Sequence, residues 1–202
     1  MSPFRIFTIA ALAALFAAAS GCATRTPEAD LFDLGPQTAA KPAQTRTLPA
    51  VSMPEVLTPT WLDGNHMFYR MLNANEQQPR PYARTRWSMS PGLLLDQRVR
   101  SRITQAGGVV VQASDGVVNL PMLRIETDDF TQNFASVSSS EARVVLRASL
   151  SMGRALLAQK TFTGVAPAPT PDATGGARAL ALASDAAIDE MIAWLASVPI
   201  KK

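Results

Sequence analysis

The sequence is poor in the side chains on which metal sites and hydrolytic catalysis depend, with one cysteine and one histidine among its 202 residues. A single thiol excludes a disulfide within the chain, and structural zinc sites need several clustered cysteine and histidine ligands. The histidine, His66, could act as a general base only beside a nucleophile, and the sequence has no G-x-S-x-G nucleophile motif. The adjacent carboxylates Asp128 and Asp129 lie in an expected strand and would point to opposite faces. We therefore expect no catalytic residue, no metal site, no separate cofactor and no enzyme activity.

Long runs of charge and long apolar runs are also scarce. The formal net charge is +3 and the charges are scattered, so the chain lacks the basic patch of a nucleic-acid-binding protein. The longest apolar run covers residues 6–19, about 14 residues, which is shorter than the ~20 that a membrane-spanning helix needs. We therefore expect no nucleic-acid partner and no transmembrane helix.

The one cysteine stands shortly after that apolar run, in the stretch ASGC at residues 19–22. Arg5 precedes the run, so residues 1–21 have the positive, apolar and small-residue regions of a secretory signal peptide. Small residues before a cysteine are typical of a lipobox, in which the thiol takes up diacylglycerol. We predict that Cys22 carries diacylglycerol and an N-acyl chain such as palmitate, with residues 22–30 as the tether. The alternative is an ordinary signal peptide, with Cys22 as an incidental free thiol.

The residue after the cysteine bears on location. In Gram-negative bacteria an aspartate at that position commonly keeps a lipoprotein in the inner membrane, whereas this chain has Ala23. Acyl chains insert into a bilayer with ~0.8 kcal/mol per buried CH₂, so several chains together anchor a protein firmly. For a Gram-negative source, we expect a protein that is lipid-anchored to the outer membrane on its periplasmic face.

Hydrophobic periodicity predicts one α+β domain over residues 31–202, because about 180 residues after the signal peptide suit a single core. Ser90 and Pro91 are typical of a helix start. We predict helices over residues 91–106 and 177–197, and strands over residues 31–35, 47–57, 65–72, 81–89, 109–113, 120–130, 141–150 and 154–162. The expected fold is a mostly antiparallel or mixed sheet with two long helices packed on one face, a two-layer sandwich.

Each expected helix has one apolar stripe that indicates its buried face. The first stripe contains Leu95, Val99 and Ile103, and the second is traced by Leu180, Ser184, Ile188, Met191, Ile192 and Leu195. The charged residues that fall mostly off these stripes are Asp96, Arg98, Arg100, Arg102, Asp185, Asp189 and Glu190.

Aromatic and arginine side chains gather in the first half of the chain, close to several prolines. Such residues often anchor protein interfaces. The candidate partner-binding residues are Trp61, Tyr69, Arg70, Arg84, Arg86 and Trp87. The alternative interpretation is that Tyr69 and Trp87 simply fill the core.

Four stretches carry a resemblance to a known family. They are LFDLGP (31–36), PTWLDGNHMFYRML (59–72), YARTRWSMSPGLLLDQRVRSRI (82–103) and AIDEMIAWL (187–195). In this order, behind a lipobox, the sequence resembles the ABC-type transport auxiliary lipoproteins, the group that includes the PqiC-like proteins. The resemblance covers roughly residues 30–198. It departs from the family where members often have two prolines after the Arg-Trp pair, because this chain has Ser90-Pro91.

The resemblance implies a non-enzymatic lipoprotein that faces the periplasm and has an α+β fold. Such proteins accompany an ABC transporter whose substrate-binding component carries an MCE domain, in systems that move phospholipid between the inner and outer membranes. The implied partners are the MCE-domain protein and, through the lipid on Cys22, the membrane itself. Self-association as a homo-oligomer is left open. The alternative is a regulatory or scaffolding lipoprotein of another envelope machine, such as peptidoglycan synthesis.

Overall fold

The computed structural model describes residues 28–37 and 48–200, and the predicted lipobox and most of the tether lie outside these ranges. Within them, the elements in chain order are β1 (Asp30–Phe32), β2 (Val51–Met53), η1 (Thr60–Leu62), β3 (His66–Met71), β4 (Asn75–Trp87), α2 (Pro91–Gln105), β5 (Val110–Gln112), η2 (Ala113–Asp115), β6 (Met122–Ser136), β7 (Ser139–Met152), β8 (Ala155–Pro167) and α3 (Ala173–Ser197). No described helix has both the length and the apolar character needed to cross a bilayer.

β6 is the strand to which the rest of the eight-stranded sheet is joined. One edge of β6 pairs along its whole length with β7 in antiparallel fashion, and β7 pairs likewise with β8. The other edge is shared by two short parallel partners, because β2 pairs near residue 122 and β3 pairs at residues 132–134. β2 continues to β5 in parallel, and β3 continues through antiparallel β4 to parallel β1.

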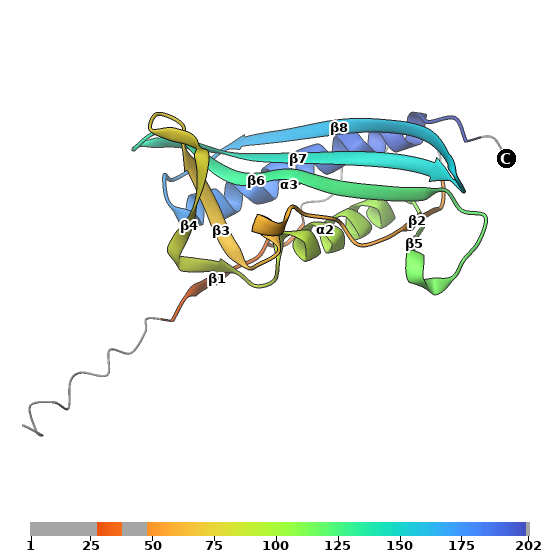
Figure 1. Cartoon of the computed structure of the whole chain (residues 1–202), viewed down its shortest axis with the longest axis horizontal. Helices are drawn as coiled ribbons and strands as arrows, with labels where there is room; N and C mark the ends of the chain where they lie inside the picture. The colour runs from red at the N-terminus through yellow and green to blue at the C-terminus, as the bar shows by residue number, and fades with distance from the viewer. Residues whose placement is uncertain (1–27, 38–47, 201–202) are drawn as a thin grey trace, which may run out of the picture.

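Figure 1 shows β6, β7 and β8 running along the long axis of the molecule, with both long helices extending in the same direction. α3 contacts β6, β7 and β8, and α2 contacts α3. The sheet curls into a half-barrel instead of lying flat. The predicted α+β class, with a mixed sheet and two long helices, is confirmed. The finer description as a mostly antiparallel two-layer sandwich is not confirmed, because four of the strand pairings are parallel and the sheet is curled.

The core follows the predicted periodicities closely. On β7, alternate side chains from Ala142 to Leu150 are fully buried, and the six predicted stripe residues of α3 are all buried as well. The helix lies directly on β8 at Gly164, where an added Cβ would stand 1.8 Å from the carbonyl oxygen of Ala183. Glycine at this position therefore lets the two backbones approach.

α3 begins about one turn earlier than predicted, at Ala173. Asp172 is its N-cap, and its carboxylate accepts a hydrogen bond from the Gly175 N–H at 2.7 Å, which lowers the pKa of Asp172. Gly175 and Gly176, which precede the predicted helix start, therefore lie in the first turn of α3 and are buried. A Cβ on Gly176 would stand 1.9 Å from Oε1 of Gln132, so glycine serves close packing here.

Candidate interaction surface

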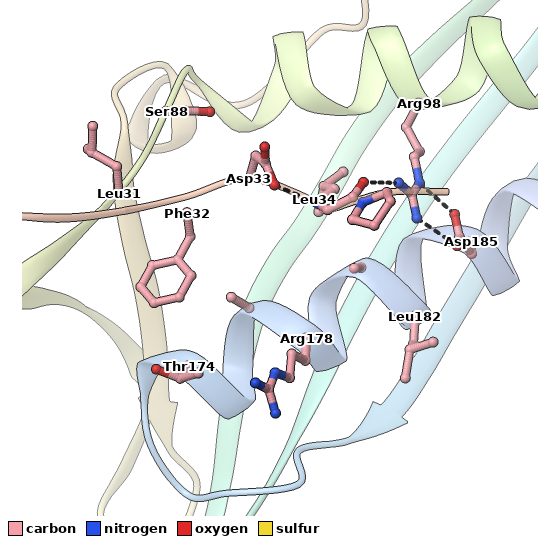
Figure 2. Close-up of a pocket in the computed structure, with 14 residues that line it drawn as sticks. Leu31, Phe32, Asp33, Leu34, Ser88, Arg98, Thr174, Arg178, Leu182 and Asp185 are labelled. Carbon is pink, nitrogen blue, oxygen red and sulfur yellow. Dashed lines mark hydrogen bonds and ion pairs between the residues drawn. The ribbon is translucent and has the colours of Figure 1, made fainter. Parts of the chain in front are cut away.

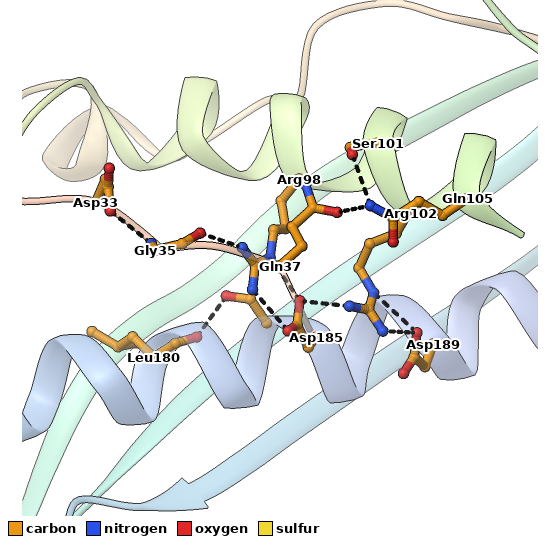
Figure 3. A network of polar contacts seen from close by, with 11 residues as sticks. Asp33, Gly35, Gln37, Arg98, Ser101, Arg102, Gln105, Leu180, Asp185 and Asp189 are labelled. Atoms are coloured by element: carbon orange, nitrogen blue, oxygen red, sulfur yellow. Dashed lines mark hydrogen bonds and ion pairs between the residues drawn. The ribbon is translucent and has the colours of Figure 1, made fainter. Parts of the chain in front are cut away.

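Two arginines of α2 are buried and reach across to α3 (Figure 3). Arg98 is 4% exposed, and its Nε and Nη2 donate to the two carboxylate oxygens of Asp185 at 2.7 and 2.8 Å. Arg102 donates through Nε to Asp189 at 3.0 Å and lies 3.3 Å from Asp185. The periodicity places these residues off the buried stripes. Arg98, Arg102 and Asp185 are buried nonetheless, and Asp189 is half-buried, because each charge meets an opposite charge in hydrogen-bonding geometry.

Arg98 also holds the segment that follows β1. Nη1 of Arg98 donates to the carbonyl oxygen of Gly35 at 2.8 Å. Gly35 has φ +65°, and its N–H donates to the carboxylate of Asp33 at 2.6 Å, so the chain turns sharply here. Leu34 between them is buried. α2, α3 and the segment after β1 are thus tied together at one guanidinium group.

A cavity of about 570 Å³ opens between β1 and the first half of α3, and we call it the β1–α3 groove (Figure 2). The Arg98–Asp185 ion pair belongs to its lining. Most of the remaining lining is apolar and comes from Leu31, Phe32, Leu34, Pro36, Ala177, Ala181 and Leu182. Leu182 is 53% exposed and Leu31 is 67% exposed, so the groove has apolar side chains in contact with solvent.

Besides Asp185, two polar side chains of α3 stand at the groove. Thr174 lies in the first turn of the helix, and Arg178 follows one turn later. Arg178 is exposed and forms no hydrogen bond or ion pair with any described residue. The groove therefore combines an apolar lining with the exposed positive charge of Arg178, which also helps to lower the pKa of the nearby Asp172 carboxylate.

The structure divides the predicted aromatic–arginine surface between two faces of β3. On one face, the Arg70 guanidinium lies 5.6 Å from the centre of the Trp61 ring, and both side chains are half-buried. Tyr69 is the next residue along the strand and points the other way, where its ring meets Tyr82 at 4.7 Å and Phe134 at 5.7 Å. Trp61 and Arg70 thus form one contact pair, and Tyr69 belongs to a separate aromatic group.

The remaining three candidates differ in what their side chains can reach. Arg84 is exposed and forms no hydrogen bond or ion pair with any described residue. Arg86 turns back on its own strand and donates to the carbonyl oxygens of Tyr82 and Thr85 at 2.8 and 2.7 Å. Trp87 is 1% exposed and packs against Phe130, with 5.4 Å between ring centres. Trp87 is a core residue and is withdrawn from the predicted contact surface.

A buried polar network joins the β3–β4 hairpin to the start of α3. The Tyr82 hydroxyl donates to Oε1 of Gln132 at 2.8 Å, and Nε2 of Gln132 donates to Ser140 at 2.8 Å and to the Asp172 carbonyl at 3.1 Å. Burial raises the pKa of Tyr82, so its hydroxyl stays protonated as a donor. The Tyr82 hydroxyl and both polar atoms of the Gln132 amide have hydrogen-bond partners, and together they position the β3–β4 hairpin against the start of α3.

The groove residues were not among the sequence-based candidates. One signal could have indicated them: Leu182 is a large apolar residue of α3 that lies off the predicted buried stripe. The one histidine of the sequence, His66, is exposed, and its ring lies 6.0 Å from that of Phe68. Among the described residues, no three His, Cys, Asp or Glu side chains are grouped as a metal site.

Comparisons with known proteins agree with this fold. The family model for the ABC-type transport auxiliary lipoprotein component matches residues 32–192. A solved structure of a Xanthomonas campestris protein has a TM-score of 0.70 and 17% identity, covering 81% of this chain and 93% of its own. A second solved structure, of a protein described as uncharacterized, has a TM-score of 0.64 and 14% identity, with coverages of 83% and 97%. No curated protein matches in sequence. At these identities, the two structures show a shared fold alone.

Proposed function

Because the chain belongs to the family of ABC-type transport auxiliary lipoprotein components, we propose that it serves an ABC transporter of the MCE type that moves phospholipid between the inner and outer membranes. In this proposal the domain has no catalytic activity of its own. It is held at the outer membrane by lipid on Cys22 and reaches an MCE-domain protein in the periplasm. The family match over residues 32–192 carries the proposal, since it spans most of the described domain.

The β3–β4 hairpin and the neighbouring η1 supply the surface that best suits a protein partner. Trp61 and Arg70 stack on each other and both remain partly accessible. Aromatic residues and arginines of this kind are enriched where interfaces carry most of their binding energy. Arg84 adds an exposed positive charge on β4 that no described residue neutralises. We infer that this hairpin meets the MCE-domain protein, with Arg84 contributing to the speed of association.

Replacing Arg84 with glutamate is expected to reduce capture of the MCE-domain protein about three- to tenfold, because an exposed interface charge acts mainly on the association rate. The loss should deepen when the salt concentration is lowered, where the reversed charge repels more strongly. The measurement is a pull-down of the full-length protein from envelope extract at low and moderate salt, with captured proteins identified by mass spectrometry.

Arg154→Glu is the matched control for this experiment. Arg154 is also an exposed arginine, but it lies in the turn between β7 and β8, far along the chain from the β3–β4 hairpin. Capture should be unchanged in this variant. If the wild-type protein captures a cell-wall synthase and no MCE-domain protein, the regulatory-lipoprotein alternative replaces this proposal.

Replacing Cys22 with serine is expected to abolish labelling by a fatty-acid analogue and to leave the precursor unprocessed. The reason is chemical: a hydroxyl does not replace the thiol as the acceptor of diacylglycerol. Labelling is measured by gel fluorescence after growth with an alkyne fatty acid. Thr24→Ala, two residues beyond the cysteine, should label as the wild type does. Full labelling of Cys22→Ser would contradict the proposed anchor.

A further inference from the structure

We propose that the β1–α3 groove binds an acyl chain of an anionic phospholipid from the membrane that holds the anchor. This inference rests on the proposed function for the position of that membrane. It assigns lipid contact to the domain itself, in addition to the covalent lipid on Cys22. Three features support this assignment: the lining of the groove, the charge beside it, and the length of chain that leads to it.

The lining suits an acyl chain because it offers apolar contact with few groups that need hydrogen bonds. Phe32 points from β1 toward the first turn of α3, and Ala177 and Ala181 form the helix side of the groove (Figure 2). Leu182 stands beside them and is 53% exposed. Covering such a leucine is favourable by about 25 cal/mol per Å² of apolar surface. A volume of about 570 Å³ lies within the usual range for small-molecule sites.

The polar side chains at the groove are three charged groups that are already paired or hydrogen-bonded, the hydroxyls of Ser88 and Thr174, and Arg178. Arg98 and Asp185 neutralise each other, and the carboxylate of Asp33 is held by the Gly35 N–H. Arg178 remains, exposed and without a hydrogen bond or ion pair among the described residues. The adjoining first turn of α3, with Thr174 in the lining, is the positive end of that helix. The carboxylate of Asp172 caps this turn and lies within electrostatic range of Arg178, so an anionic headgroup placed over the groove would share both positive features with Asp172.

The tether brings this groove close to the bilayer. β1 begins at Asp30, which is eight residues after Cys22. An extended chain spans at most ~3.3–3.6 Å per residue, so the start of β1 lies within roughly 28 Å of the anchored residue. The groove is lined by the residues that follow immediately, and it is therefore held near the membrane surface.

A peptide fits this groove less well than an acyl chain. A bound peptide must satisfy its own backbone N–H and C=O groups, and the nearest strand edge is β1, with only three residues. The side chains of the lining offer it few free partners. An acyl chain has no such requirement, so we commit to lipid as the occupant.

Photo-crosslinking of the full-length protein tests this inference. The protein is reconstituted into vesicles of phosphatidylethanolamine and phosphatidylglycerol, in which a trace of phosphatidylglycerol carries a diazirine on one acyl chain. Crosslinked peptides are located by mass spectrometry. We expect the crosslinks to concentrate on Phe32 and on residues 177–182. Crosslinks spread evenly over exposed apolar residues, or confined to residues before 30, would overturn the inference.

Two variants make the test specific for the groove. Ala181→Trp should fill the groove and reduce crosslinking there about fivefold or more, since an occupied cavity cannot accept a chain. Val118→Trp is the matched control, because Val118 is 75% exposed on the loop before β6, and it should leave crosslinking unchanged. Circular dichroism verifies that each variant is folded. If Ala181→Trp does not fold, Leu182→Asp takes its place with the same expectation. Unchanged crosslinking in the folded groove variant would refute the inference.

A separate substitution tests the preference for an anionic headgroup. Arg178→Glu should reduce crosslinking by the phosphatidylglycerol probe about threefold more than crosslinking by a matched phosphatidylethanolamine probe, because charge reversal repels the anion. Equal losses for both probes would remove the anionic preference. Lipid crosslinks in the groove without capture of an MCE-domain protein would uphold this inference and contradict the proposed transporter, and the reverse result would do the opposite.

Discussion

Asp185→Ala is expected to destabilise the domain by about 3–5 kcal/mol, because it removes one partner of a buried ion pair and leaves the other charge uncompensated. Arg98 is 4% exposed and binds both carboxylate oxygens of Asp185, and Arg102 lies 3.3 Å from the same carboxylate. The measurement is the free energy of unfolding from chemical denaturation.

Two further variants separate the charge from the volume of the lost side chain. Arg98→Met with Asp185→Leu replaces both charges with apolar groups of similar size, and it should recover most of the lost stability. Glu190→Ala is the matched control on the same helix, and it should change stability by less than ~0.5 kcal/mol because Glu190 is exposed. A loss below 1 kcal/mol for Asp185→Ala would show that water reaches Arg98, contrary to the burial described above.

Gly164→Ala is expected to cost about 3 kcal/mol or more, at the upper end of the usual range for overpacking. The added Cβ would stand 1.8 Å from the Ala183 carbonyl oxygen and 2.7 Å from its carbonyl carbon. Both are backbone atoms of α3, so no side-chain rotation can relieve the contact. The helix must move away from β8, which opens the packing along its length. Thermal and chemical denaturation both measure this loss.

The control for this substitution is Gly64→Ala. Gly64 lies in the turn before β3, where an added Cβ would meet only the His66 ring at an ordinary 3.5 Å. Its effect should stay within ~0.5 kcal/mol. Equal stability of Gly164→Ala and Gly64→Ala would contradict the close packing of α3 on β8.

The elements that the sequence predicts well are those specified by local patterns. α2 starts at Pro91 as predicted, and Gly107 follows its end with φ +83°, the left-handed conformation that glycine adopts readily. β7 shows strict alternation of apolar and polar side chains, and every apolar member from Ala142 to Leu150 on the predicted face is buried. In these cases the residues that decide the structure lie within a few positions of one another.

The elements that the sequence predicts poorly depend on distant partners. Arg98 and Asp185 are 87 positions apart, and periodicity alone assigns each charge to the outside of its own helix. The parallel pairing of β1 with β4 likewise joins residues that no local pattern connects, such as Asp30 and Thr85. Long-range pairing therefore decides both the mixed sheet and the buried ion pairs.

The candidate contact residues show the same limit at the level of single side chains. Trp87 and Arg84 stand three residues apart in one stretch, yet Trp87 is in the core and Arg84 is exposed. Residues 84–87 alternate between accessible and buried, so strand alternation separates Arg84 and Arg86 from Trp87, but the pattern alone does not say which face is buried. The buried face is decided by a contact between distant positions, in which Trp87 packs against Phe130 of β6.

The shared use of β6 also constrains the order in which the chain can fold. β2 and β3 both lie N-terminal to β6 and both use its edge, so the segments that contain them cannot join one sheet before residues 122–136 arrive. If the chain emerges N-terminus first, the apolar stripe of α2 is therefore exposed to solvent until more than half of the chain has emerged. Contacts of such long sequence separation form slowly. We expect holding chaperones of the envelope to bind this first half until β6 docks, after which α3 can close over the sheet.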